Sequence, residues 1–265
     1  MTAEAVNTLG DELRSRTQPL ESDTFASALV TLRDGLSSSN AHTATAALEA
    51  LLPFWPLLST NASLLKAINT LIQLNVDKLG DANKRTRTLA GQALLQAAQT
   101  CLNFTITEDS ALTQLEALVK EGFSSKQART RESCLFYIRD IRKVDSSLPL
   151  RQWLPFLLAC LEDSDASVRE SAREVTVQLY TDRQVPEAAR ADLRKELQKN
   201  NIRGAEELIA RLVHQKEEVG LGVPEGRQQA NRTTSATSVG SVASVGATPL
   251  DAVQTVYVRL SLLSA

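Results

Sequence analysis

Asp81-Ala-Asn-Lys-Arg-Thr86-Arg87 leads into an amphipathic stretch, and the same short pattern returns as Ser125-Lys-Gln-Ala-Arg-Thr130-Arg131 and as Asp163-Ser-Asp-Ala-Ser-Val168-Arg169. The arginines that close the three copies stand 44 and 38 residues apart. A period near 40 residues in a helical chain is typical of stacked helix pairs. One such pair cannot bury its apolar face alone, so neighbouring pairs share a continuous core. The pattern therefore predicts an all-α HEAT-repeat solenoid that binds something large, and it argues against a catalytic pocket.

Apolar residues recur at intervals of three and four along residues 3–217, which is the spacing of amphipathic helices. We predict helices at about 3–16, 22–36, 41–52, 62–79, 83–101, 108–121, 126–143, 149–162, 166–181, 186–199 and 203–217. The turns predict five helix pairs and leave the first helix unpaired. Because that helix lacks a partner, we expect Val6, Leu9 and Leu13 to be only half covered.

The composition limits the classes of partner. The chain has 265 residues, 43% of them hydrophobic, which is enough for a sizeable core. Its net charge of −2 produces no overall field that would select nucleic acid or a membrane surface. No apolar run approaches the roughly 18 residues of a membrane span, and the N-terminus does not resemble a signal peptide. We therefore expect neither nucleic acid nor a membrane as partner.

The composition changes after Val219. Residues 1–219 read as the HEAT-repeat domain, and residues 220–250 are rich in Ser, Thr, Gly and Val. Such a stretch cannot bury a core, so we predict a disordered linker. Residues 251–265 become apolar again, and we interpret them as the truncated start of a following segment.

Residues typical of catalytic and metal sites are not clustered in the sequence. His42 and His214 stand far from any second histidine or Cys/Asp group at metal-ligand spacing. Cys101, Cys134 and Cys160 lie in apolar helical settings and are expected to be buried, reduced thiols. We predict no enzymatic activity, no metal and no cofactor.

Basic residues gather at the turns inside the helix pairs, and in a solenoid equivalent turns line up along one edge. Lys84 and Arg85 come from one turn and Lys126 and Arg129 from the next, with Arg87 and Arg169 at helix entries. Helix N-termini add positive potential to the same edge. We therefore predict that this edge binds an acidic partner. An alternative for Arg87, Arg131 and Arg169 is that they pair with Asp81 or Asp163 of a neighbouring turn.

Three stretches carry a resemblance to a known family. Leu71 to Asp81, followed by Lys84-Arg85-Thr86-Arg87, resembles the third repeat of a TOG domain, and Leu157 to Arg169 resembles the fifth. Ala191-Asp192-Leu193-Arg194-Lys195-Glu196-Leu197 with Asn201-Ile202-Arg203 is similar to the sixth repeat of the N-terminal TOG domain of CLASP (CLIP-associating) proteins, of fungal type. The resemblance covers residues 3–217.

The resemblance implies a paddle whose turns face tubulin, in a factor that stabilises and rescues microtubules. The implied turns are 35–43, 80–85, 122–129 and 162–168, and the first adds Asn40 to the candidate site. The helix at 3–16 corresponds to the second helix of the family's first repeat, so the chain reads as incomplete at both ends. The implied locations are the cytoplasm, the cytoskeleton, the mitotic spindle and the nucleus.

Two hypotheses of function remain open. The leading one is a non-catalytic module that binds tubulin or microtubules. The alternative is a HEAT adaptor that binds another protein, for instance a kinetochore or plus-end factor, without touching tubulin. A nucleic-acid-binding solenoid would require a strong basic bias and stacking aromatics, and the sequence has neither.

Overall fold

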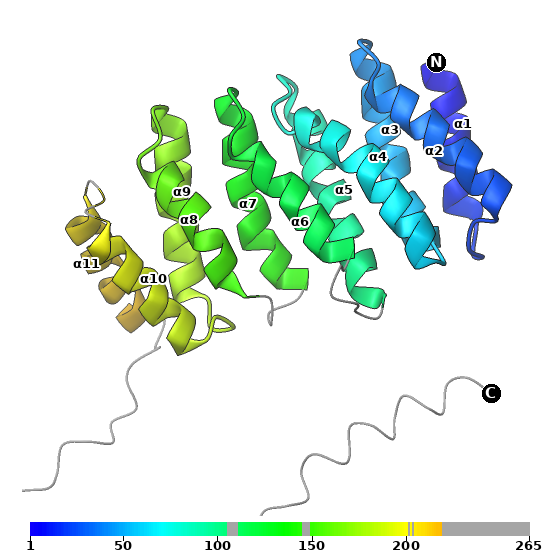
Figure 1. Ribbon diagram of the computed structural model, residues 1–265. Coiled ribbons are helices and arrows are strands. Elements are labelled where there is room, and N and C mark those ends of the chain that lie inside the picture. Colours follow the sequence, from blue (N-terminus) through cyan, green and yellow to red (C-terminus); the bar gives the residue numbers. More distant parts are fainter. Residues whose placement is uncertain (105–110, 145–148, 201, 203, 219–265) are drawn as a thin grey trace, which may run out of the picture. The chain divides into compact units, whose positions relative to one another are not determined.

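Eleven α-helices follow one another in the computed structural model, and no strand occurs among the residues it describes, 1–104, 111–144, 149–200, 202 and 204–218 (Figure 1). The helices are α1 (Ala3–Ser15), α2 (Ser22–Leu36), α3 (Ala41–Phe54), α4 (Asn61–Lys78), α5 (Lys84–Asn103), α6 (Ala111–Gly122), α7 (Ala128–Val144), α8 (Leu154–Leu161), α9 (Ala166–Thr181), α10 (Glu187–Lys199) and α11 (Ala205–Glu218). Short 3-10 turns, η1 (Trp55–Leu57) and η2 (Leu150–Trp153), precede α4 and α8. The predictions for residues 220–250 and 251–265 lie outside the described residues.

The helices pack in two layers. The odd-numbered helices α1, α3, α5, α7, α9 and α11 contact one another in sequence order. In the facing layer α2 contacts α4, α4 contacts α6, and α8 contacts α10. Each even-numbered helix also packs on the odd-numbered helix that follows it, giving five pairs. This is the predicted all-α HEAT-type solenoid, with α1 as the additional helix.

Helix α1 is better covered than the sequence suggested. It packs against α3 and α2, and Val6 and Leu13 are fully buried, while Leu9 is partly buried. Small residues allow this close approach, since a Cβ atom placed on Gly10 would lie 3.4 Å from the Cβ of Ala50. The expectation that all three apolar residues would be half covered was therefore wrong for Val6 and Leu13.

Two helix boundaries near prolines differ from the prediction: α3 ends later than expected, and α8 begins later. Helix α3 continues through Pro53 to Phe54. Pro53 has no N–H to donate, but the backbone N–H of Trp55 donates to the carbonyl oxygen of Leu51, so helical hydrogen bonding continues past the proline. The predicted helix at 149–162 is instead η2 followed by α8, and Pro155 lies in the first turn of α8, where proline is tolerated. None of the helices in the described part of the chain is long and apolar enough to cross a membrane.

Candidate protein-binding ridge

Four turns repeat the same hydrogen-bonding pattern. The residue directly before α3, α5, α7 and α9 donates its backbone N–H to a side-chain oxygen two residues earlier in the chain. The pairs are Asn40 to Ser38 (3.1 Å), Asn83 to Asp81 (2.7 Å), Gln127 to Ser125 (3.2 Å) and Asp165 to Asp163 (2.8 Å). Figure 1 shows the turns at one end of the helix pairs, and we call residues 37–40, 79–83, 123–127 and 162–165 the turn ridge.

The residues directly before α3, α5 and α9 also cap these helices. The side-chain oxygen of Asn83 accepts from the backbone N–H of Arg85 at 2.8 Å, and that of Asp165 accepts from Ser167 at 2.8 Å. Asn40 accepts from His42 at 2.9 Å. Such bonds satisfy N–H groups that have no partner inside the helix. The predicted site residue Asn40 is therefore exposed on the ridge and is also the cap of α3.

The three repeated arginines close their own turns. Arg87 Nη1 donates to the carbonyl oxygens of Asp81 (2.7 Å) and Ala82 (3.0 Å). Arg169 Nη1 donates in the same way to Asp163 (2.6 Å) and Ser164 (2.9 Å), and Arg131 Nη1 donates to Ser125 (2.7 Å). The structure thus gives Arg87 and Arg169 an internal role. Their partners are backbone carbonyl oxygens, whereas the sequence analysis considered ion pairs with the carboxylates of Asp81 or Asp163 in a neighbouring turn.

Arg131 alone among these three arginines also forms the expected ion pair with a neighbouring turn. Its Nε and Nη2 atoms each lie 2.7 Å from one oxygen of Asp163, and both side chains are about nine-tenths buried. The Arg131 guanidinium holds the pKa of Asp163 below its ordinary value. This two-bond geometry fixes the orientation of both groups as well as their distance. The ion pair therefore links the α6–α7 turn to the α8–α9 turn.

The remaining candidate residues are exposed. Lys84, Lys126 and Arg129 lie on the surface at or beside the two middle turns. Arg85 is 72% exposed and pairs with Glu49 of α3 at 2.5 Å, so part of its charge is offset by a residue of this chain. Exposed side chains of this kind are available to a partner. Lys84, Lys126 and Arg129 are therefore exposed basic residues of the α4–α5 and α6–α7 turns.

The formal charge changes sign along the ridge. Each turn is represented by nine residues. They run from three residues before to five residues after the residue that directly precedes α3, α5, α7 or α9. Residues 37–45 carry no charge, and residues 80–88 and 124–132 carry +2 each. Residues 162–170 carry −3, from four acidic residues against Arg169. The basic character is therefore confined to the α4–α5 and α6–α7 turns.

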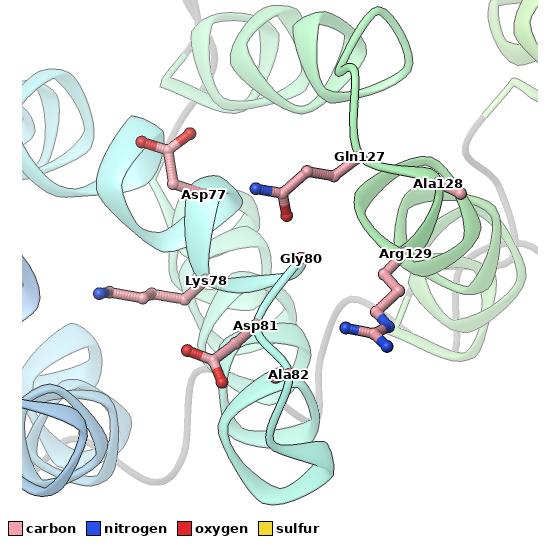
Figure 2. Close-up of a pocket in the computed structure, with 8 residues that line it drawn as sticks. All are labelled: Asp77, Lys78, Gly80, Asp81, Ala82, Gln127, Ala128 and Arg129. Atoms are coloured by element: carbon pink, nitrogen blue, oxygen red, sulfur yellow. The ribbon is translucent and has the colours of Figure 1, made fainter.

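A groove lies between these two basic turns. It has a volume of about 610 Å³ and is lined by Asp77, Lys78, Gly80, Asp81, Ala82, Gln127, Ala128 and Arg129. In Figure 2 the side chains of Gln127 and Arg129 extend from α7 toward the gap, while Asp81 and Lys78 point away from it. A Cβ atom on Gly80 would lie 2.0 Å from Gln127 Oε1, so glycine keeps this side of the groove open. Gly80 and Gln127 fall within the turns 80–85 and 122–129 that the family resemblance implied, but neither was singled out as a site residue, because only the charged residues of these turns and Asn40 were.

Three cysteines and one glutamate are buried between the helices, away from the turn ridge. Burial raises the pKa of Cys101, Cys134 and Cys160 to about 12, so each thiol stays protonated and is a poor nucleophile. Glu116 accepts a hydrogen bond from Gln152 at 2.9 Å, and burial raises its pKa. The described residues hold no group of three side chains that could bind a metal ion.

The amino-acid sequence is similar to a known protein family and to several fungal proteins. The model of the CLASP N-terminal family matches residues 5–205. Protein STU1 of Mycosarcoma maydis is 33% identical over 158 residues, which cover 56% of this chain and 12% of that protein. Protein STU1 of Phaeosphaeria nodorum is 30% identical over 135 residues, covering 51% of this chain and 10% of that protein. The chain thus spans about a tenth of the length of the curated relatives it matches.

Solved structures share the fold. The MAST/Orbit N-terminal domain superposes with a TM-score of 0.63 at 22% identity, covering 83% of this chain and 90% of that one. A second structure comes from work on tubulin recruitment and assembly by microtubule polymerases with TOG domain arrays. It superposes with a TM-score of 0.55 at 18% identity and covers 74% of this chain and 43% of that one. The CEP104 TOG domain superposes with a TM-score of 0.54 at 12% identity and covers 80% of this chain and 86% of that one. At these identities the likeness establishes the fold alone.

Proposed function

The chain belongs to the CLASP N-terminal family, and from this premise we propose that it is a non-catalytic module that binds tubulin through the turn ridge. The binding is electrostatic, and it acts between the basic side chains of two neighbouring turns and an acidic protein surface. No bond of the partner is made or broken, so the effect on microtubules is a shift in the stability of lattice ends.

The observation that carries this proposal is the grouping of Lys84, Lys126 and Arg129 on two adjacent turns. These side chains are exposed in a protein whose net charge is only −2, so the basic region is local. A local patch of one sign steers and orients a partner of the opposite sign. A protein similar in fold has been described in the context of tubulin recruitment by TOG domain arrays, which supports tubulin as that partner.

The wider role follows from the family and is part of the same proposal. We expect the protein to contribute to microtubule stabilisation and rescue in cytoplasmic arrays and the mitotic spindle, and thus to act at the cytoskeleton and in the nucleus. Plus-end and kinetochore proteins are further proposed partners.

The test is direct binding by the chain of 265 residues. Microtubules assembled from purified tubulin are sedimented with the protein at increasing salt, and unpolymerised tubulin is run with it on a size-exclusion column. We expect binding that weakens with salt, because exposed charges are screened over roughly 8–10 Å at moderate ionic strength. Absence of binding in both assays would instead favour the adaptor hypothesis.

A further inference from the structure

The α4–α5 turn is docked directly on α7, the helix that follows the other basic turn. The hydroxyl of Ser133 in α7 donates to the carbonyl oxygen of Leu79 at 3.1 Å. Leu79 is the C-cap residue of α4, and carbonyl groups at a helix C-terminus have no donor within the helix. Ser133 therefore satisfies a backbone group of the α4–α5 turn from a position 54 residues further along the chain.

Close packing accompanies this hydrogen bond. Gly80, which follows Leu79, is buried, and a Cβ atom there would lie 2.5 Å from Thr130 Oγ1 and still closer to Gln127 Oε1. Figure 2 shows Gly80 beside the side chain of Gln127. Gln127 and Thr130 stand at the start of α7, so the turn approaches α7 this closely only because position 80 carries no side chain.

The helices that lead into the two basic turns are also packed closely. Gly122 ends α6, and a Cβ atom there would lie 2.6 Å from Cys134 Sγ of α7 and 3.1 Å from Val76 Cγ1 of α4. Helix α4 also contacts α7, two positions beyond its own partner α5. The α4–α5 and α6–α7 turns are thus joined by a hydrogen bond and by two close approaches of the backbone.

We propose that Ser133 is a positioning residue for tubulin binding, which fixes the α4–α5 turn against α7 through its bond to Leu79. Lys84 on one turn then meets the partner together with Lys126 and Arg129 of the other, as one preformed surface. This inference rests on the proposed function, because it explains how the two basic turns act together. A surface whose parts are already fixed avoids the conformational entropy that ordering two separate turns would cost on binding.

The chain offers a matched control, because Ser171 occupies the same position in the next repeat. Each serine follows an Arg-Glu pair, and Ser171 in α9 donates to Glu132 Oε1 of α7 at 2.8 Å. Both hydroxyls join neighbouring repeats by one hydrogen bond, so removing either should cost the fold a similar amount. Of the two serines, Ser133 alone bonds to a basic turn.

The experiment compares Ser133→Ala and Ser171→Ala in the full chain. Microtubule sedimentation measures affinity, and urea unfolding measures stability. Hydrogen exchange without tubulin measures the protection of the backbone N–H groups of Gly80 and Asp81, which bond to carbonyl oxygens of α4. We expect Ser133→Ala to bind about two- to fivefold more weakly and to exchange these N–H groups about three- to tenfold faster. Ser171→Ala should lose similar stability and change affinity and exchange less than about twofold.

The contrary results are equally defined. Unchanged binding or unchanged exchange in Ser133→Ala would overturn the inference, because the bond to Leu79 would then not position the turn. An equal loss of binding in Ser171→Ala would also overturn it, since affinity would follow stability and not the geometry of the basic turns. If the unaltered chain fails to bind microtubules, the proposed function itself fails, and the inference falls with it whatever the exchange result.

Discussion

Asp163 receives two hydrogen bonds of 2.7 Å from Arg131 and at the same time accepts the backbone N–H of Asp165 at 2.8 Å. One carboxylate therefore shapes its own turn and fastens it to the turn before. The carbonyl of the same residue also accepts from Arg169 at 2.6 Å. Asp163 is thus the residue through which the α6–α7 and α8–α9 turns are held in a fixed relation.

Asp163→Asn should lower the free energy of unfolding by about 1.5–3 kcal/mol at neutral pH, because a charged hydrogen-bond pair that is largely buried is broken. The pKa of Asp163 is lower in the folded chain than its ordinary value of 3.8, so the ionised carboxylate favours the folded state. This contribution is complete above the unfolded pKa and is lost as pH falls through the folded pKa. The difference between the two proteins in denaturant titrations should therefore be full at pH 7 and should begin to shrink as pH falls below about 4. A difference that persists unchanged at acid pH would contradict the ion-pair account.

Glu116→Gln should leave the fold as stable or stabilise it at neutral pH. Burial raises the pKa of Glu116, so the ionised form is disfavoured in the folded chain. Glutamine keeps an acceptor for the Gln152 amide and carries no charge. The advantage of the variant should be present above the raised pKa and should shrink as pH falls and Glu116 becomes protonated. Thermal unfolding between pH 4 and 8 measures this, and a variant markedly less stable at pH 8 would contradict it.

Arg169→Ala should reduce stability by about 1–2 kcal/mol, because two carbonyl oxygens lose their charged donor. Tubulin binding by the folded fraction should change little, since the guanidinium is occupied within its own turn. Unfolding by urea and sedimentation of the same preparation separate the two effects. A loss of binding at unchanged stability would instead place Arg169 in the contact.

Gly80→Ala and Gly91→Ala form a matched pair. A Cβ atom on Gly80 would lie 2.5 Å from Thr130 Oγ1 of a buried side chain, so we expect a loss of about 1–3 kcal/mol and a narrower groove. A Cβ atom on Gly91 has nothing within 4 Å and lies inside α5, where alanine should add about 0.5–1 kcal/mol. Equal effects at both positions would argue against close packing at the α4–α5 turn.

The helical repeat could be predicted from the sequence because its signal is local. The turn pattern occurs three times, each time with an arginine six residues after its first residue. These three copies were sufficient to place α5, α7 and α9. The fourth turn was not recognised as a copy, since Ala44 stands where the arginine would be; its Ser38 corresponds to Ser125 of the second copy. Its hydrogen bonds nevertheless match, because a serine hydroxyl can accept the same N–H as a carboxylate.

The candidate site could be predicted only as a set of turns with their basic residues and Asn40, without the contacts that each side chain makes. Whether an arginine faces a partner or its own turn depends on contacts between residues five or more apart, as for Arg87 with Asp81 and Ala82. The pairing of Arg85 with Glu49 joins residues 36 positions apart. The groove likewise depends on how Gly80 meets the following turn, which periodicity does not specify.

The central claim is that the two middle turns of the ridge bind tubulin. Its most direct test is microtubule sedimentation of the variant that combines Lys84→Glu, Lys126→Glu and Arg129→Glu, with circular dichroism to check helix content. The matched control reverses Arg151, Arg194 and Lys195, which are exposed away from the ridge. Exposed charge contacts contribute on the order of 1 kcal/mol or less each, so we predict a loss of about tenfold or more for the ridge variant and little for the control. Undiminished binding by the ridge variant, or an equal loss in the control, would contradict the claim.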